Sequence, residues 1–442
     1  MQRKRRTMPT TRTTGRLLTT TTTRTTRTRS FPSSLVAKKG QGECVALHDG
    51  RTVHFKEYVT IDEVFDAYYD CRKHKRSKRS AVEYELNYEL NNYDLWVELN
   101  SMTYRPTTSI AFCVTKPRLR EVFAADFRDR VVHHLFIKRI HDAVEGRLTD
   151  RAFACRIGKG TLFGARKVAE MMGREEEWYV KCDIEGFFMS IDKEVLMGLV
   201  EEVVRESVKE NVDWWLWLAR VIVMHRPERD CEIHGNPKLW DDLPDNKTLF
   251  KTDGMPIGNL PSQVLANLYL AEFDRWVIER VGEKNYARYV DDWMAKCESK
   301  GELVRLLRDA RRWLWEKRRL SLHKRKVCIQ KARRGVGFTG YFIKNGVIHA
   351  GKRMRGRAVE LCEKWSERAV HSDEERVKLR DSYNSYCGLL KHTASWRVRR
   401  KMWRRLGEYE GLVCVNMEKI ETSFGSRKRE EGTQKSQKAQ KL

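Results

Sequence analysis

Two adjacent aspartates within YARYVDDWMAK, residues 286–296, are the residues best placed to do chemistry in this chain. Residues 287–290 suit a strand, Asp291 and Asp292 follow, and residues 293–295 suit a second short strand. Because aspartate is depleted in strands and favoured in turns, we predict a hairpin with both carboxylates at its tip. Two carboxylates this close repel each other, and a divalent cation is the usual partner that keeps both ionised. An ordinary solvated turn is the alternative interpretation.

A third carboxylate, Asp183, stands at the end of another predicted strand, residues 177–182. Beside the predicted hairpin it would complete a three-carboxylate site of the kind that holds two Mg²⁺ ions roughly 3.5–4 Å apart. Mg²⁺ takes oxygen ligands, typically one or two carboxylates plus phosphate oxygens. One ion would lower the pKa of an attacking hydroxyl, and the other would neutralise a triphosphate and its leaving pyrophosphate. Taken alone, Asp183 could equally be a capping or turn residue.

Between these aspartates, residues 254–270 (GMPIGNLPSQVLANLYL) predict a tight loop that opens a helix. Gly258 permits a sharp turn, Asn259 suits an N-cap, and Pro261 is tolerated in the first turn of a helix. Small and polar residues at such a helix start can lie against a base pair without blocking it. A well-capped core helix with no ligand would show the same pattern.

Other regular elements must position these side chains. Residues 45–100 have a mainly helical pattern, although residues 84–90 alternate with period two. Residues 104–120 become strand-like, and Pro117 restricts them to a sheet edge or a hairpin tip. Residues 121–140 end in a helical run.

Taken together and in order, these stretches resemble the fingers and palm of reverse transcriptases over residues 101–400. Asp183 with Phe187 and Phe188 is similar to the first palm motif, GMPIGNLPSQ to the second, and YVDD to the YxDD box. Residues 320–326 (LSLHKRK) resemble the following lysine motif, and residues 337–341 (GFTGY) resemble the primer-grip hairpin. Each likeness is weak by itself, but the ordered set is very specific.

The resemblance assigns roles to individual residues. It implies metal ligation of two Mg²⁺ ions by the catalytic carboxylates of Asp183, Asp291 and Asp292, assisted by the carbonyl of Ile184. Deoxynucleoside triphosphates would be bound by Lys116, Arg120, Phe188, Ile257, Gly258 and Lys326. The template and primer would be contacted by Ser262, Gln263, Tyr289, Phe338 and Gly340. Phe188 matches a steric gate that excludes a ribose 2′-hydroxyl. Lys326 matches a lysine that protonates pyrophosphate, and a simple phosphate contact explains it equally well.

The same resemblance implies an α+β, right-hand polymerase fold with fingers, a palm whose antiparallel sheet carries the YVDD hairpin, and a short helical thumb. The expected limits are an N-terminal helical extension at 41–100, fingers at 101–182, palm at 183–345 and thumb at 346–415. Residues 1–40 contain eleven Lys or Arg and no Asp or Glu, and thirteen of the first thirty residues are Thr. We predict that this basic tail and the charged tail at 416–442 are disordered. A transit peptide, a non-specific electrostatic arm and a start at Met8 remain open for the first tail.

Within this family, the chain is most similar to the enzymes of diversity-generating retroelements and their close bacterial relatives. Ile257 and Gly258 stand where group II intron and retroviral enzymes carry Gln-Gly, and Ser262 and Gln263 stand where Ser-Pro is common. Residues 120–136 and 385–392 are also similar to that group. The resemblance implies a cytoplasmic, bacterial or phage-encoded enzyme that copies a template RNA with frequent errors opposite adenine, for mutagenic retrohoming. A small basic accessory protein would be its partner.

Ile257 offers a physical link to those errors. A glutamine at this position could hydrogen-bond near the nucleotide sugar and the arginine of the fingers, and isoleucine cannot. Losing one polar contact would weaken discrimination by ~1–3 kcal/mol.

The formal charge of +26, from 87 basic and 61 acidic residues, agrees with a nucleic-acid partner. No apolar run approaches ~20 residues, so a membrane partner is not expected. The eleven cysteines include no CxxC pair, which argues against a zinc module and fits reduced thiols in the cytosol. Two other functions stay open: a retron or phage-defence reverse transcriptase, and an RNA-binding scaffold with an inactive palm. The complete set of three aspartates argues against the scaffold.

Overall fold

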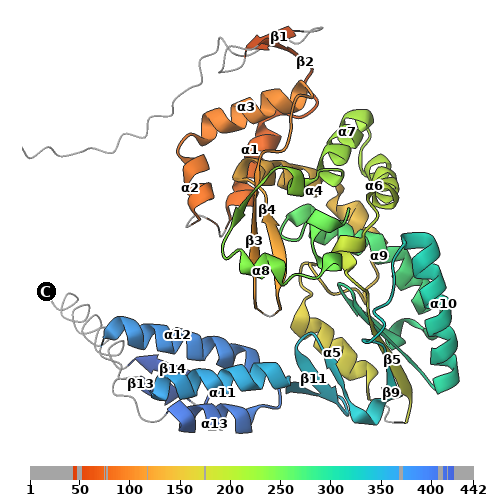
Figure 1. Ribbon diagram of the computed structural model, residues 1–442, viewed down its shortest axis with the longest axis vertical. Helices are drawn as coiled ribbons and strands as arrows, with labels where there is room; N and C mark the ends of the chain where they lie inside the picture. Colours follow the sequence, from red (N-terminus) through yellow and green to blue (C-terminus); the bar gives the residue numbers. More distant parts are fainter. Residues whose placement is uncertain are drawn as a thin grey trace, which may run out of the picture.

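The protein is described from a computed structural model in which α-helices surround several small sheets (Figure 1). Residues 1–40 and most of 416–442, which we predict to be disordered, lie outside the described part of the chain. The structure describes residues 43–46, 52–73, 75, 78–116, 118–173, 176–367, 372–406, 412–415 and 417–422.

A four-stranded antiparallel sheet in the order β7-β8-β5-β9 carries the three aspartates. Its strands are β7 (Tyr286–Tyr289), β8 (Asp292–Cys297), β5 (Trp178–Asp183) and β9 (Cys328–Lys331). β5 lies at the centre, so Asp183 and the strand that carries it belong to the same sheet as the hairpin. The expected limit between fingers and palm, at residues 182 and 183, falls one residue before the end of this strand.

Side chains alternate across the sheet, so its two faces bury different cores. Val180, Cys182 and Trp293 point to one face and pack into the larger core. Tyr179 and Met294 point to the other face and pack into a smaller core.

The larger core is formed by long helices whose apolar faces cover the first face of the sheet. These helices are α4 (Phe127–Arg147), α6 (Lys193–Ser207), α7 (Val212–Val223), α9 (Leu260–Val281) and α10 (Lys300–Arg318). The smaller core lies beneath α5 (Thr161–Met171) and a three-stranded sheet. Its strands are β10 (Val336–Phe338), β11 (Tyr341–Lys344) and β12 (Val347–Ala350).

The predicted fingers contain a second small sheet in the order β4-β3-β6. Its strands are β3 (Ser109–Val114), β4 (Arg120–Ala124) and β6 (Cys231–His234). β3 and β4 are antiparallel neighbours, and the turn between them contains Lys116. The predicted strand character of residues 104–120 is therefore confirmed over residues 109–114 and at Arg120.

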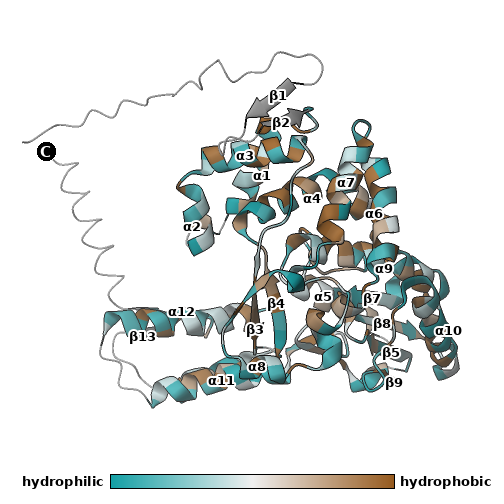
Figure 2. Ribbon diagram, turned by 45° about the horizontal axis from the view of Figure 1, so that its top comes forward, coloured by the Kyte–Doolittle hydropathy of each residue, from teal (hydrophilic) through white to brown (hydrophobic). Residues whose placement is uncertain are grey.

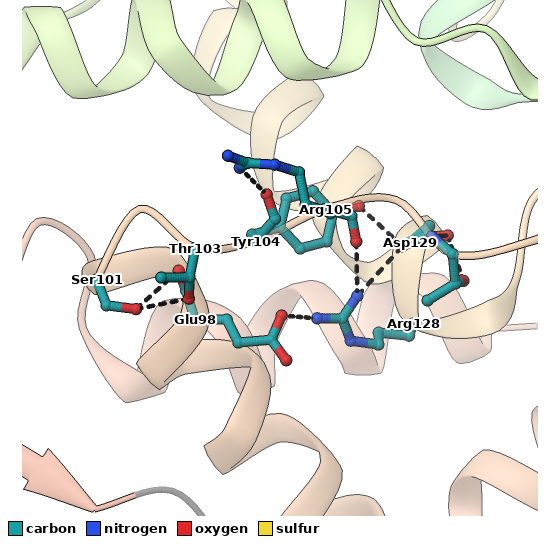
Figure 3. A network of polar contacts seen from close by, with 8 residues as sticks. Glu98, Ser101, Thr103, Tyr104, Arg105, Arg128 and Asp129 are labelled. Carbon is teal, nitrogen blue, oxygen red and sulfur yellow. Dashed lines mark hydrogen bonds and ion pairs between the residues drawn. The ribbon is translucent and has the colours of Figure 1, made fainter. Parts of the chain in front are cut away.

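Three N-terminal helices precede this sheet: α1 (Ile61–Arg72), α2 (Arg79–Glu85) and α3 (Tyr88–Asn100). A polar network joins α3 and the segment before β3 to the start of α4 (Figure 3). The buried carboxylate of Asp129 accepts hydrogen bonds from the Tyr104 hydroxyl at 2.8 Å and from the Thr107 amide and hydroxyl at 2.9 and 2.7 Å. Arg128 pairs with Glu98 of α3 and lies 5.0 Å from the Tyr104 ring. Burial raises the pKa of Asp129, and its hydrogen bonds oppose that shift. The stretch at residues 120–136 thus includes two residues, Arg128 and Asp129, that fix α4 to the preceding segment and to α3.

Three helices and a hairpin follow β12 as a separate cluster in the predicted thumb, at the lower left of Figure 1. They are α11 (Lys352–Ser366), α12 (Asp373–Leu390), α13 (Trp396–Leu406), β13 (Leu412–Val415) and β14 (Lys419–Thr422). Tyr383, Cys387 and Met402 fill their common core.

The mainly helical pattern predicted for residues 45–100 is confirmed by α1, α2 and α3. The segment nevertheless begins with a hairpin of β1 (Glu43–Ala46) and β2 (Thr52–Phe55), whose two four-residue strands leave too little periodicity to recognise. One expectation about local structure is wrong. The tail expected to be disordered from residue 416 includes β14, which pairs with β13. Over the described residues, every helix is too short or too polar to cross a bilayer.

Candidate active site

The turn between β7 and β8 contains only two residues, Val290 and Asp291, because Tyr289 pairs directly with Asp292. The predicted hairpin is therefore confirmed, although Asp292 is the first residue of a strand and only Asp291 lies in the turn. Val290 has φ 58°, in the left-handed region. Two-residue hairpins with positive φ at the first turn position favour glycine there, and a β-branched residue is an outlier. The tip of the hairpin is consequently strained.

Arg288 holds this strained turn from within the core. Its Nη1 donates a 2.9 Å hydrogen bond to the carbonyl of Val290, and its guanidinium forms two bonds of 2.6 and 2.7 Å with Asp274 of α9. Arg288 and Asp274 are 1% and 0% exposed. The Tyr286 hydroxyl donates to the same carboxylate at 2.6 Å, and Asn267 accepts from Arg288 at 3.2 Å. A buried ion pair is tolerated when additional hydrogen bonds satisfy both partners, as they do here.

Strand register brings the third aspartate to the hairpin. Asp183, the last residue of β5, lies directly opposite Asp292, the first residue of β8. One residue further, the amide of Ile184 donates to the carbonyl of Asp291 at 3.3 Å. Asp183, Asp291 and Asp292 therefore meet at one end of the sheet, as we predict from the sequence.

Two lysines neutralise part of this acidic cluster. Lys326 lies 2.9 Å from Asp183, and Lys181 lies 2.8 Å from Asp292. Lys181 precedes Asp183 by two residues on the same face of β5, as strand alternation requires.

Lys326 reaches the site because the loop before it follows the end of β5. The amide of His323 donates to the carbonyl of Asp183 at 2.8 Å, and the amide of Glu185 donates to Ser321 at 2.9 Å. Leu322 forms a bridge with Ile184 between these two bonds.

The carboxylates of Asp291 and Asp292 are shielded enough from water to shift their pKa values. Burial raises the pKa of Asp291 to about 6, and the charge of nearby Asp183 adds to the shift. Burial also raises the pKa of Asp292, while Lys181 lowers it. The Oδ1 atom of Asp292 is buried and has no hydrogen-bond partner.

An oxygen-only donor set with an unsatisfied carboxylate oxygen fits a hard divalent cation. Asp183, Asp291 and Asp292 are the side chains that would hold it, with the Ile184 carbonyl beside them. In the part of the chain that the structure describes, no three His, Cys, Asp or Glu side chains are already arranged as a metal cage. One oxygen each of Asp183 and Asp292 instead faces an ammonium group.

The loop before α9 connects the palm to the fingers strand that begins at Arg120. The carbonyl of Ile257 accepts from the Phe123 amide of β4 at 2.8 Å, and the Ile257 side chain packs against the small core containing Phe123. Gly258 has φ 127°, and a Cβ there would lie 2.7 Å from the Phe123 carbonyl oxygen. Glycine is therefore required for this close approach.

Phe188, the predicted steric gate, is half-buried beside the same loop. Its carbonyl accepts from the Met255 amide at 2.7 Å, and a Cβ on Gly254 would lie 2.3 Å from that carbonyl oxygen. The ring of Phe188 packs on Phe187 at 5.5 Å. The carbonyl of Phe188 is thus held closely against the loop at residues 254 and 255.

Lys116 and Arg120 are exposed at opposite ends of the turn between β3 and β4. Neither side chain forms an ion pair with Asp183, Asp291 or Asp292. Lys116 instead lies near Glu360 of α11, whose pKa is lowered mainly by Lys364 and to a smaller extent by Lys116. The turn between β3 and β4 therefore lies on the side of its sheet toward α11.

The five predicted template–primer residues divide into exposed and buried groups. Gln263 and Gly340 are exposed, and Tyr289 is half-buried. Ser262 and Phe338 are only 2% and 1% exposed. Phe338 packs in the smaller core, so its side chain supports the β10–β11 turn from below. Direct contact with a primer would require these two side chains to leave the core.

Sequence reasoning missed Lys181, Arg288 and Asp274 as parts of the site. Lys181 had a recognisable signal, because a residue two positions before a strand-end carboxylate shares its face. The pair of Arg288 and Asp274 had no recognisable signal in the sequence. The two residues are fourteen positions apart, on either side of the end of α9, and nothing local indicates that their charges are buried together.

Residues 114–343 match the family model described as "Reverse transcriptase (RNA-dependent DNA polymerase)". A search of the curated proteins gives no match.

Three telomerase structures are among the similar solved ones. Telomerase from Candida albicans with a fragment of telomeric RNA has TM-score 0.40 and 8% identity, over 69% of this chain and 63% of that one. Truncated apo telomerase from Candida tropicalis has TM-score 0.39 and 10% identity, over 55% of each chain. Apo telomerase from Candida tropicalis has TM-score 0.43 and 8% identity, over 67% of this chain and 55% of that one. The chain thus spans less than two thirds of the length of these telomerases.

The raised pKa of Asp291 predicts a pH-dependent stability in the absence of divalent cations. The folded protein binds this proton more tightly than the unfolded chain, so the stabilisation is complete below about pH 3.8 and is lost as pH rises through 6. At ~1.4 kcal/mol per pKa unit, reduced by solvent screening, the free energy of unfolding should decrease by about 1–3 kcal/mol over this pH range. Urea unfolding of the wild type in EDTA, repeated between pH 4 and pH 7, should show this decrease in the free energy of unfolding. Asp291→Asn should reduce the slope of that free energy against pH. Equal slopes for the two proteins would contradict the assignment.

Proposed function

The chain belongs to the reverse transcriptase family of RNA-directed DNA polymerases, and from this premise we propose that it copies a template RNA into cDNA. The observation that carries the proposal is the register of β5 and β8, which sets Asp183 opposite Asp292 and beside Asp291. A mixed helix-and-sheet arrangement of fingers, palm and thumb accompanies it, as in the right-hand polymerase fold.

The proposed cofactor is Mg²⁺, as two ions held by Asp183, Asp291 and Asp292 with the Ile184 carbonyl. When bound, such ions lower the pKa of a primer hydroxyl and stabilise the charge that develops on the phosphates. Release of Lys181 and Lys326 from the carboxylates would leave both ammonium groups near the reacting phosphates. Lys326 could then contact or protonate the departing pyrophosphate.

The bound nucleotide would lie between the carboxylates and the fingers. Phe188 would exclude a ribose 2′-hydroxyl, because its backbone is fixed by the Met255 amide and cannot easily move the ring aside. Lys116 and Arg120, which are exposed and free of carboxylate partners in the site, would contact the triphosphate.

The thumb helices would hold the template and primer. The exposed side of α13 is strongly basic, and it also carries an exposed tryptophan, Trp396, whose ring lies 5.2 Å from the Arg400 guanidinium. Basic groups contact phosphates and aromatic rings stack on bases. The lysine at the tip of the fingers lies near Glu360 of α11, so fingers and thumb border the same space.

Within this family, we propose the diversity-generating type, with frequent errors opposite adenine. Support comes from the sequence IGNLPSQ at residues 257–263 and from the stretch at 120–136. The structure adds that Ile257 packs between the fingers strand and the palm, where a glutamine would present an amide to the same space. A small basic accessory protein and a specific template RNA are the proposed partners.

Polymerase activity tests the main proposal. With Mg²⁺, the wild type should incorporate deoxynucleotides on a primed RNA, and Asp291→Ala should reduce the rate by at least ~10³-fold because one metal ligand is lost. Asp142→Ala, at an exposed carboxylate on α4, is the matched control and should remain active. Failure of the wild type to extend with cognate RNA and accessory protein present would reject the polymerase assignment.

Ile257 tests the proposed subtype. The wild type should misincorporate more often opposite adenine than opposite other bases, and Ile257→Gln should reduce that excess by roughly 5- to 100-fold if one polar contact is restored. Ile257→Val, which keeps an apolar side chain, is the control and should retain the errors. Sequencing of cDNA from a template of balanced composition gives the measurement. Equal fidelity opposite all four bases in the wild type would contradict the diversity-generating assignment. An unchanged error rate in Ile257→Gln would show that Ile257 does not cause the errors opposite adenine.

A further inference from the structure

Helix α10 carries a row of exposed basic and aromatic side chains that the proposed catalytic site does not use. Its members recur at intervals of three and four residues and therefore lie on one side of the helix. We call this row the α10 stripe, and it consists of Arg305, Arg308, Arg312 and Trp315 of the helix together with Arg319, the C-cap residue that follows its last turn.

The opposite side of α10 is fully committed to the protein core. Leu303, Leu306, Ala310 and Leu314 are buried in the larger core against the central sheet. The helix therefore cannot turn its apolar side outward, and the stripe is its permanent outer surface. Figure 2 shows the hydrophilic colour that dominates this outer helix.

The charges of the stripe are only weakly satisfied within the chain. Asp309 pairs with Arg308 at 3.2 Å and with Arg312 at 3.7 Å, and these arginine side chains are 75% and 70% exposed. Exposed pairs of this kind contribute little stability and exchange readily for another anion. Over the described residues, no salt bridge involves Arg305 or Arg319.

An exposed tryptophan lies between these arginines. Trp315 is 56% exposed, and it lies about one turn from Arg312 and from Arg319 on the same side of the helix. Guanidinium groups bind phosphates through two parallel hydrogen bonds, and aromatic rings stack on bases. The row from Arg305 to Arg319 covers about 21 Å at 1.5 Å per residue, which corresponds to roughly six phosphates of one strand.

The stripe faces away from the proposed template–primer site. α10 covers the face of the sheet that contains Val180 and Trp293, whereas α5, β10–β12 and the thumb that follows lie on the other side. Figures 1 and 2 both place α10 across the central sheet from α11 and α12. A duplex held between the thumb and the carboxylates would not reach the stripe.

We propose that the α10 stripe binds a segment of RNA that lies outside the copied template. This inference rests on the proposed function, since it adds a second contact for an RNA that the enzyme copies. An anionic membrane is disfavoured because the apolar side of α10 is buried and Trp315 is the only aromatic residue in the row.

The test uses the full-length protein and a blunt RNA hairpin whose 3′ end is blocked, so that it cannot serve as a primer. Binding is measured with a short primed template already occupying the cleft. The double variant Arg308→Glu/Arg312→Glu should bind the hairpin at least tenfold more weakly than the wild type. The matched control Arg79→Glu/Arg205→Glu changes the net charge equally at exposed positions in ion pairs and should bind nearly as the wild type does.

Milder variants separate binding from folding. Arg308→Gln/Arg312→Gln should reduce the slope of log affinity against log salt by about two, because two phosphate contacts are lost. Trp315→Ala should weaken binding severalfold without changing that slope. All variants should extend the short primed template at the wild-type rate, and this separates the inference from the proposed function: a wild type that never extends rejects the polymerase assignment alone.

Three results would overturn the inference. One is equal hairpin affinity in the wild type and both arginine variants. Another is displacement of the hairpin by the primed template, which would place the hairpin in the cleft. The third is stripe-dependent binding of phosphatidylserine vesicles or polyglutamate with no stripe-dependent binding of the hairpin.

Discussion

The buried ion pair between Arg288 and Asp274 is the interaction on which the geometry of the candidate site depends. Taking both charges out of water is costly, and here the cost is offset by two direct bonds and by further bonds to Tyr286, Asn267 and the Val290 carbonyl. The last of these bonds extends the pair to the hairpin turn. Since Val290 is strained, the turn would otherwise relax and move Asp291 and Asp292 relative to Asp183. The core of α9 thus determines where two of the three carboxylates point.

Charge balance is the second constraint on the site. Three carboxylates at one sheet end would repel each other, and Lys181 and Lys326 compensate for part of that repulsion. Burial and the charge of Asp183 together still raise the pKa of Asp291 to about 6, so the compensation of the repulsion is incomplete. A carboxylate cluster that is only partly neutralised favours the binding of a further cation. In the proposed function the same lysines would then face the phosphates, so each would act both before and after a metal ion binds.

Local patterns were sufficient to predict the hairpin, because the strand residues, the two aspartates and the second strand are contiguous. They were also sufficient to place Asp183 at a strand end. They could not show that Asp183 pairs with Asp292, because pairing of distant strands depends on the whole core, and only the family resemblance placed them together. The buried pair of Arg288 and Asp274 was unpredictable for the same reason. Motif likeness also assigned Ser262 and Phe338 to the template and primer, but it carries no information on burial, and both side chains lie in the core.

The central claim is that residues from β5 and from the β7–β8 hairpin form one metal site. Oxidative cleavage with Fe²⁺ in place of Mg²⁺ tests it directly, because radicals formed at a bound ion cut the nearest backbone. Peptide mapping should find cuts next to both Asp183 and Asp291, and excess Mg²⁺ should suppress the two together. Asp183→Asn should weaken both cuts equally. Cleavage at only one segment, or cuts that respond independently to Mg²⁺, would contradict a shared site.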